Sequence, residues 1–354
     1  MTQVLALLGG VAWAGPEACE VALADLVNDD TVDYQLAKQT CPLRAAQLSG
    51  NEVAFHKVGV RDLPSEPTAC VAHTAAATAA IVPASAVLEL DGAAYLTTHR
   101  GLGLALQDSS LPGACTVDAH PCPIDQQGEP DVQALLRTWY PQPVWAGCTG
   151  VLLDQGLLLT AGHCADVGLD AYVVFADLAK VEPATGCQQV GPQLFGCDTA
   201  GATPLTAARI TTASGVLGAD IAFWQVAPLP GVTLPEPIGL DRLAPQLPAQ
   251  VAGTPVYSIG YPLGLPAKLA RDGELRGAHD GLVDVSLDAF VGSSGTPVYG
   301  CDDNKLLGLL VQGEPDFACV GGCAIFEDYR DDTWQRAEEL VGVTTLRAAL
   351  GGLP

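Results

Sequence analysis

Short apolar runs separated by turn residues fill the chain from Pro143 onward. The runs are three to six residues long and lie between positions rich in Gly, Pro, Asn and Asp; they are 151–153, 157–160, 172–175, 221–226, 256–259, 297–299 and 306–311. Short strands with regular turn signals are typical of a β-barrel or a β-sandwich. Val343, Leu346 and Leu350 then recur at helical spacing before two glycines, which predicts a C-terminal helix.

The part of the chain before residue 126 has a different pattern. It begins with apolar residues at imperfect helical spacing, and the segment 86–96 then alternates apolar and polar positions around Asp91 and Gly92. An Asp-Gly pair between apolar runs predicts a β-hairpin. We therefore expect residues 15–125 to form a smaller α+β N-terminal region, either a propeptide or an accessory domain.

Residues 118–130 are rich in Pro, Gly and polar side chains, a composition that suits a linker. The segment 131–140 follows with apolar residues at the spacing of a short amphipathic helix. We place the domain boundary at this linker, so that residues 126–354 form the strand-rich domain.

The N-terminal residues have the pattern of a secretion signal. An apolar run from Val4 ends in Ala12-Trp13-Ala14, a small-x-small pattern that predicts removal of residues 1–14. The segment lacks the usual Lys or Arg, and a buried N-terminal strand is the alternative. The run is too short to cross a bilayer, which takes about 20 apolar residues. We expect a secreted or periplasmic protein that does not insert into a membrane.

Length and charge narrow the possible classes of protein. The chain has 354 residues, which suggests two domains at roughly 150 residues each. Hydrophobic residues make up 49% of the chain, which is enough for globular cores. The formal net charge of −24 argues against nucleic acid and anionic membrane surfaces as partners, because Lys and Arg must neutralise their phosphates.

Twelve cysteines favour an oxidising compartment. The sequence has no pair of C-x-x-C motifs of the kind that binds zinc. Cys115, His120 and Cys122 are close in sequence, but oxidised cysteines do not bind metal, so no metal site is expected. We expect Cys187 and Cys197 to close a local loop.

The cysteine counts also bear on how the two regions are connected. Five cysteines precede residue 126 and seven follow it. Both counts are odd, so at least one disulfide must join the two regions if all twelve pair. Cys122 is the candidate for the cysteine of the first region that forms this bridge. Cys301 is expected to pair with either Cys319 or Cys323.

Three short segments carry the residue types that acyl transfer needs. They are Thr-Ala-Gly-His-Cys around His163, Ala-Asp-Ile-Ala-Phe around Asp220, and Gly-Ser-Ser-Gly-Thr-Pro around Ser294. A serine hydroxyl becomes a nucleophile when a base takes its proton, and neutral histidine suits this role near pH 7. A carboxylate orients the imidazole, and backbone N–H groups beside glycine stabilise the oxyanion. The combination predicts a serine hydrolase without a cofactor.

These segments resemble the active-site signatures of the chymotrypsin/trypsin-like serine peptidases. The order His, Asp, Ser is the chymotrypsin-type order, and residues 147–150 resemble the strand that precedes the histidine in that family. Residues 257–266 and 306–317 are similar to bacterial secreted members, among them relatives of glutamyl endopeptidase. The resemblance covers residues 143–350. It implies a mainly β fold of two antiparallel β-barrels, with the active site between them.

The resemblance also implies roles for individual residues. Ser294 would be the nucleophile, His163 the general base and then the general acid, and Asp220 the group that orients the imidazole. The N–H groups of Gly292 and Ser294 would form the oxyanion hole.

The resemblance bears on two further features, a disulfide that the chain shares with the family and a residue at which it departs from the family. Cys148 and Cys164 should form a disulfide. Ser293 occupies the position of an aspartate that, in trypsin-like zymogens, pairs with the newly cut N-terminus. A serine cannot make that ion pair, so we predict activity that does not depend on a new N-terminal amine.

The resemblance also implies two specificity residues, Asp288 and Gly313. Asp288 lies six residues before Ser294, where trypsin carries its pocket carboxylate, which would attract Arg or Lys of a substrate. Gly313 would leave the pocket wall open. The alternative is that Asp288 only caps a loop.

The sequence therefore predicts a secreted serine endopeptidase that acts on proteins or peptides. One alternative is a catalytically inactive protein of the same fold that acts as a binding module. An esterase of unrelated fold is disfavoured, because Thr296 occupies the position of the second glycine in the G-x-S-x-G motif.

Overall fold

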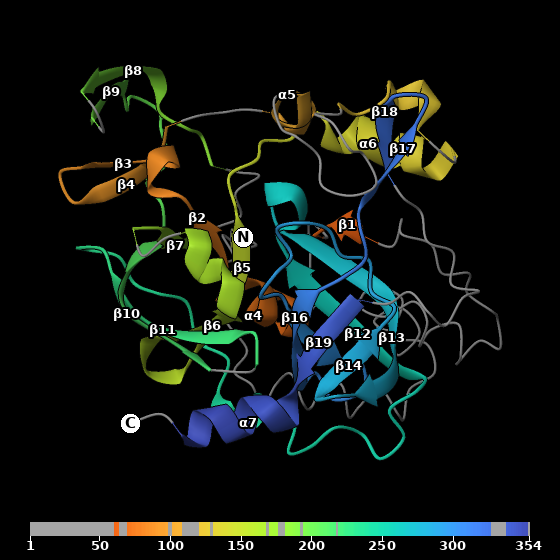
Figure 1. Ribbon diagram of the computed structural model, residues 1–354. Coiled ribbons are helices and arrows are strands. Elements are labelled where there is room, and N and C mark those ends of the chain that lie inside the picture. The colour runs from red at the N-terminus through yellow and green to blue at the C-terminus, as the bar shows by residue number, and fades with distance from the viewer. Residues whose placement is uncertain are drawn as a thin grey trace, which may run out of the picture.

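The structure is a computed structural model that describes residues 60–63, 69–97, 101–107, 120–127, 130–167, 170–175, 181–191, 194–216, 219–326 and 338–352. The predicted signal peptide and the first helix-like stretches lie outside these residues. The described chain is mainly β and forms two six-stranded barrels side by side, with helices at their edges (Figure 1).

The first barrel has the strand order β10-β11-β6-β5-β2-β7 and closes through the pairing of β10 with β7. Every neighbouring pair is antiparallel. Its strands are β2 (Thr78–Val82), β5 (Cys148–Leu153), β6 (Leu157–Ala161), β7 (Tyr172–Val174), β10 (Ala207–Val216) and β11 (Ile221–Pro228). Strands β2 and β5 are buried along their whole length, so they form the side that packs into the molecule.

The second barrel has the order β13-β12-β15-β16-β19-β14, and β14 closes it by pairing with β13. Strand β1 is added on the free edge of β13. The strands are β1 (Val60–Asp62), β12 (Thr254–Gly260), β13 (Lys268–His279), β14 (Leu282–Val285), β15 (Pro297–Gly300), β16 (Leu306–Gln312) and β19 (Glu338–Gly342). The two-barrel architecture implied by the sequence is confirmed.

The remaining elements lie around the barrels. The C-terminal helix α7 packs against β16 and β19, below the second barrel in Figure 1. These elements are α4 (Ala69–Ala77), β3 (Val87–Leu90), β4 (Ala93–Leu96), α5 (Leu102–Gln107), α6 (Pro130–Trp139), β8 (Thr185–Gly191), β9 (Leu194–Asp198), β17 (Phe317–Val320), β18 (Cys323–Phe326) and α7 (Val343–Gly351). None of the helices in the described part of the chain is both long and apolar enough to span a membrane.

Several local predictions are confirmed. Each of the seven apolar runs coincides with a strand, apart from Phe175, which follows the end of β7, and helices α6 and α7 occupy the two predicted helical segments. Strands β3 and β4 form the hairpin predicted around Asp91-Gly92. Both turn residues have positive φ, 52° for Asp91 and 83° for Gly92, as a tight two-residue turn requires.

The predicted boundary at residue 125 does not separate the barrels from the chain before them. Strand β2 lies between β5 and β7 in the first barrel, and β1 pairs with β13 in the second. A boundary at that point would therefore cut both sheets. The sequence concealed β2 because α4 and β2 form one Ala-rich apolar run, whose pattern does not distinguish a helix from a buried strand.

The interpretation of residues 118–130 as a linker is wrong for the part that the structure describes. Cys122 is bonded to Cys323 in a disulfide, and its N–H donates to the carbonyl oxygen of Ala324 at 2.7 Å. The side chain of Gln127 is fully buried; it donates to the Cys122 carbonyl and accepts the N–H of Phe326 at 2.9 Å. This segment is a strap across the hairpin β17–β18.

Helix α6 extends the strap toward the loop that carries Ser294. Trp139 is buried and packs edge-on against Phe290, with ring centroids 5.7 Å apart. Phe290 in turn packs edge-on against Phe326 of the hairpin, with ring centroids 6.1 Å apart. Figure 1 shows α6 beside β17 and β18, so the insertion between β2 and β5 supports the second barrel.

Candidate active site

His163 and Asp220 meet because of how β6 and β11 pair. His163 lies in the 3₁₀ turn Gly162–Val167 directly after β6, and Asp220 directly precedes β11. The two strands are antiparallel, with Ala161 opposite Ile221. In such a pair the end of one strand lies beside the start of the other, so residues far apart in sequence become neighbours.

The carboxylate of Asp220 uses both oxygens on His163. Oδ2 lies 2.6 Å from Nδ1, and Oδ1 accepts the backbone N–H of His163 at 2.8 Å. An ionised carboxylate only accepts hydrogen bonds, so Nδ1 carries the proton and Nε2 is left as the basic nitrogen. Gly162 permits this approach, because a side chain carbon there would lie 2.7 Å from Oδ1.

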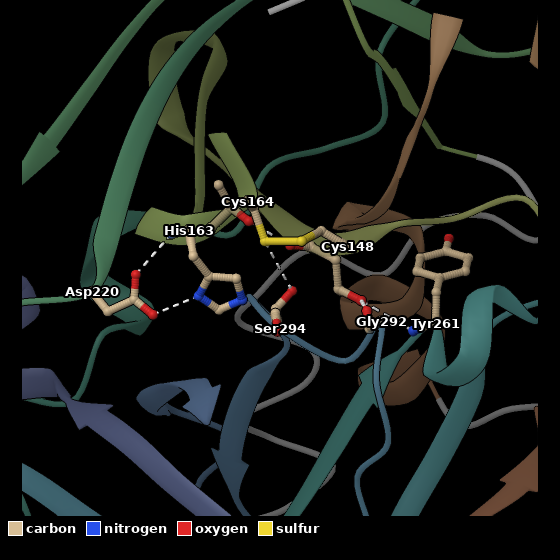
Figure 2. Close-up of a disulfide and its surroundings, with 9 residues drawn as sticks. Cys148, His163, Cys164, Asp220, Tyr261, Gly292 and Ser294 are labelled. Atoms are coloured by element: carbon tan, nitrogen blue, oxygen red, sulfur yellow. Dashed lines mark hydrogen bonds and ion pairs between the residues drawn. A yellow bond between two sulfur atoms is a disulfide. The ribbon is translucent and has the colours of Figure 1, made fainter. Parts of the chain in front are cut away.

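The histidine and aspartate are open to solvent. Their side chains are 43% and 40% exposed. Figure 2 shows the imidazole of His163 between Asp220 on one side and Ser294 on the other. The three residues predicted from separate segments are thus brought together at the junction of the barrels.

Ser294 comes from the loop between β14 and β15 and is fixed against the first barrel. Its carbonyl oxygen accepts the N–H of Thr149 on β5 at 2.8 Å. Gly295 follows with φ of 85°, and a side chain there would run into Thr149 and Thr160. Only glycine fits this contact between the two barrels.

The disulfide implied by the resemblance is present. Cys148 at the start of β5 is bonded to Cys164, the residue after His163, with Cα atoms 6.1 Å apart (Figure 2). It ties the histidine turn to the strand that also carries Thr149. The Cys122–Cys323 disulfide shows that Cys323 is not the partner of Cys301. Cys197 is disulfide-bonded, while the side chain of Cys187 lies outside the described residues.

The predicted oxyanion donors belong to a loop whose carbonyl groups are engaged elsewhere. The carbonyl of Val291 accepts the N–H of Leu263 at 2.5 Å, and that of Ser293 accepts the N–H of Thr296 at 2.9 Å. The C=O and N–H of a trans peptide point in opposite directions, so the N–H groups of Gly292 and Ser294 point away from these partners. Within the described part of the chain, neither donates to another group.

One of the two predicted specificity residues, Gly313, lies against an acid that the sequence analysis missed. Asp288 is half-buried between β14 and Ser294, and Gly313 directly follows β16. The space beside Gly313 is not open, because the buried carboxylate of Glu338 occupies it. Glu338 begins β19, and its alternation with buried Leu340 was the available signal for an inward-facing acid.

Two groups of potential metal ligands occur among the described residues. One is His163 with Cys148 and Cys164, whose sulfurs are bonded to each other and offer no thiolate. The other surrounds His279, which lies 2.9 Å from Asp284. The hydrogen bond to Asp284 raises the pKa of His279. A metal ion at this group would have to displace the proton that this hydrogen bond favours, because a ligating imidazole is neutral.

Comparison with known proteins bears on the same region. No curated protein matches the chain. Among solved structures, human heparin binding protein is similar at 14% sequence identity and a TM-score of 0.38, over 59% of this chain and 86% of that one. The family model described as the trypsin-like peptidase domain matches residues 148–309, the stretch that contains His163, Asp220 and Ser294.

Proposed function

We propose that this protein is a serine endopeptidase that cleaves peptide bonds through an acyl-enzyme. The observation that carries the proposal is the hydrogen-bonded pair of His163 and Asp220 beside Ser294 at the junction of two β-barrels. The match of residues 148–309 to the trypsin-like peptidase domain supports it.

In the proposed reaction, Nε2 of His163 takes the proton of the Ser294 hydroxyl as Oγ attacks the substrate carbonyl. The resulting oxyanion accepts hydrogen bonds from the N–H groups of Gly292 and Ser294, and Asp220 stabilises the imidazolium. The imidazolium then gives its proton to the leaving amine, which departs. A water molecule, deprotonated by His163, attacks the ester, and collapse releases the acid and restores Ser294.

We further propose cleavage after Arg or Lys. Asp288 precedes Ser294 by six residues, and the buried carboxylate of Glu338 lies against Gly313. A carboxylate at the base of the substrate pocket, the position that the resemblance implies for Asp288, would favour a cationic substrate side chain. A peptide library should show a basic preference at the cleaved bond that weakens in Asp288→Asn. An unchanged basic preference in that variant would refute the role of Asp288.

The proposed location is outside the cell or in the periplasm. Disulfides persist in oxidising compartments, and the described chain contains Cys148–Cys164 and Cys122–Cys323. The second bridge supports a covalent attachment of the segment before residue 126 to the second barrel. Expression of the full chain in a reducing cytosol should give less folded protein than export does. Equal yields of folded, equally stable protein would count against this location.

We also propose that the peptidase unit includes β1 and β2 and so begins no later than Val60. Deletion of residues 1–125 removes one strand from each of the two barrel sheets, together with the hairpin β3–β4, and should prevent folding. A deletion variant with a cooperative unfolding transition and peptidase activity would restore the boundary at residue 125.

Hydrolysis of unstructured protein substrates tests the proposed activity directly. Purified full-length chain should cleave internal peptide bonds of casein, whereas Ser294→Ala should not. Ser214→Ala, which alters an exposed serine on β10, is the matched control and should retain full activity. A folded wild-type protein that cleaves no substrate would favour the alternative, a binding protein of the same fold.

A further inference from the structure

The loop 290–294, here called the oxyanion loop, has every one of its backbone carbonyl groups in a hydrogen bond. Ser293 donates its N–H to the carbonyl of Phe290 at 2.8 Å. Gly292 accepts the hydroxyl of Thr149 at 3.1 Å. Together with the bonds from Leu263 to Val291 and from Thr296 to Ser293, these contacts fix each carbonyl of the turn.

Val291 is the residue of this loop that side-chain packing constrains least. Its side chain is 57% exposed, so packing does little to hold it. The next residue, Gly292, has φ of 92°, and glycine rotates more freely than any other residue. The direction of the Gly292 N–H therefore depends on what holds the backbone of Val291 on either side.

A buried carboxylate holds one side. Oδ2 of Asp316 accepts the N–H of Val291 at 2.7 Å. Asp316 is 4% exposed and lies between β16 and β17, 25 residues away in sequence. A hydrogen bond to a charged acceptor is about twice as strong as a neutral one. On the other side, Leu263 donates its N–H to the Val291 carbonyl.

Ser293 completes the turn without a charge. It is 5% exposed, and its hydroxyl oxygen accepts the N–H of Phe290 at 3.3 Å. The side chain of Ser293 therefore makes its hydrogen bond inside the loop. The sequence analysis had predicted only that this side chain could not form an ion pair with an N-terminal amine. The acidic group that binds the loop is instead Asp316, from the connection between β16 and β17.

We propose that Asp316 is a positioning residue that holds the Gly292 N–H in its donor orientation, so that the oxyanion loop is assembled by the folded chain without a new N-terminal amine. The proposal rests on the proposed peptidase function. It identifies Asp316, which does not touch the substrate, as the group that sets the oxyanion donor through Val291.

Kinetics of two variants of the full-length chain test the role. Loss of one oxyanion donor typically costs about 10²–10³ in kcat. Asp316→Ala should lower kcat by about 10- to 100-fold, with KM nearly unchanged and a parallel loss of affinity for a peptide aldehyde that mimics the tetrahedral intermediate. Asp316→Asn keeps an acceptor oxygen and should recover most of the activity.

The matched control is Asp303→Ala, because Asp303 is an exposed acid of the same barrel that also accepts a backbone N–H, from Lys305 at 3.1 Å. It should leave kcat unchanged. Equal kcat in Asp316→Ala and wild type would overturn the proposal, as would a loss that appears only in KM.

Amide hydrogen exchange separates this inference from the proposed function. The Val291 amide should exchange slowly in wild type and in Asp316→Asn, and faster in Asp316→Ala. An unprotected Val291 amide in a wild-type enzyme that cleaves peptides would refute the role of Asp316 alone. A protected amide in a chain that cleaves nothing would refute the peptidase function and leave the anchoring contact standing.

Discussion

The two barrels contribute residues to the site that differ in how exposed and how firmly held they are. The first barrel provides His163 and Asp220, whose side chains are more than a third exposed and contact each other through one short hydrogen bond. The second barrel provides Ser294 and the oxyanion loop, in which the carbonyl groups are all engaged. One half is open to water and the other is fixed by its backbone.

The difference follows from what each half has to do. The imidazole acquires and gives up a positive charge in the proposed reaction, and exposure to water lowers the cost of that charge. The oxyanion donors act only if their dipoles already point at the developing charge, because any reorganisation would cost free energy. An open proton-transfer half and a rigid nucleophile half are therefore both expected.

Thr149 of the first barrel connects the two halves. Its hydroxyl donates to Gly292 and accepts the N–H of Tyr261, each at 3.1 Å, and its N–H donates to Ser294 (Figure 2 shows Gly292 and Tyr261 beside the site). The rigidity of the second half is thus partly supplied by the first barrel. Substitution of Thr149 is therefore a direct way to test whether the two halves differ as described.

The largest effect should come from the proton-transfer half. In His163→Ala, kcat should fall on the order of 10⁶-fold, since residues that act as a unit lose nearly the whole contribution together. Asp220→Asn should lower kcat about 10⁴-fold, because an amide favours the wrong imidazole tautomer. Steady-state kinetics on one peptide substrate measure both. An Asp220→Asn variant within tenfold of wild type would contradict the assigned role of the carboxylate.

The next effect tests the contact between the barrels. Gly295→Ala forces a side chain into Thr149 and Thr160 at a φ of 85°. Strain and overpacking should lower the free energy of unfolding by about 3 kcal/mol or more. Urea unfolding followed by tryptophan fluorescence measures the loss. Gly281→Ala provides the control, because it also has positive φ but has open space around it; a similar loss there would show that strain alone is responsible.

A smaller effect should follow from removing one hydroxyl between the halves. Thr149→Val keeps the shape of the side chain but loses the donor to Gly292 and the acceptor for Tyr261. Leaving these buried groups unpaired costs about 1–3 kcal/mol, and kcat should fall with little change in KM. Thr211→Val on exposed β10 removes a comparable hydroxyl bond, to Gln225, away from the site. A fall in kcat for both variants would contradict a specific role for Thr149.

The smallest effects concern stability against pH at two histidines. Burial lowers the pKa of His73, a side chain whose Nε2 lies 3.3 Å from the Pro237 carbonyl, although nearby Glu236 acts in the opposite direction. A depressed pKa contributes stability that is present above the unfolded value of about 6.5 and is lost as pH falls through the folded pKa. Wild type should therefore lose more stability than His73→Gln between pH 7.5 and pH 5.

His279 should behave in the opposite way. The hydrogen bond to Asp284 raises its pKa, so its contribution is present below about pH 6.5 and is lost as pH rises through the folded pKa. It is exposed, so the change should be small. Urea unfolding of wild type and His279→Gln at pH 5 and pH 8.5 measures it. A wild-type advantage that grows with pH would contradict this sign.

The sequence pointed to the residues that the structure brings together better than it pointed to the residues that support them. His163 and Ser294 lie in short segments in which glycines and a cysteine surround the reactive side chain, and the strands of most apolar runs are clear from their pattern. Strand β13 was missed because charged residues interrupt it, and β2 because it continues an Ala-rich helix. In both, pairing with neighbouring strands overrides local preference.

The supports depend on contacts that local patterns do not encode. Asp316 acts on a residue 25 positions earlier, and Glu338 lies against Gly313 only because β16 pairs with β19. Cys122 was identified as the bridging cysteine from the odd counts and from its place in the expected linker, whereas its partner Cys323 follows from the folded strap. Such residues require the register of the sheets, which the sequence leaves open.

Labelling with a fluorophosphonate probe tests the central claim most directly. The probe phosphonylates a serine only where a base and oxyanion donors activate it. The account predicts one adduct per folded chain, mapped by mass spectrometry to Ser294, and none in Ser294→Ala or His163→Ala. A folded wild-type chain that takes up no probe, or takes it up at a different serine, would contradict the assignment of Ser294, His163 and Asp220.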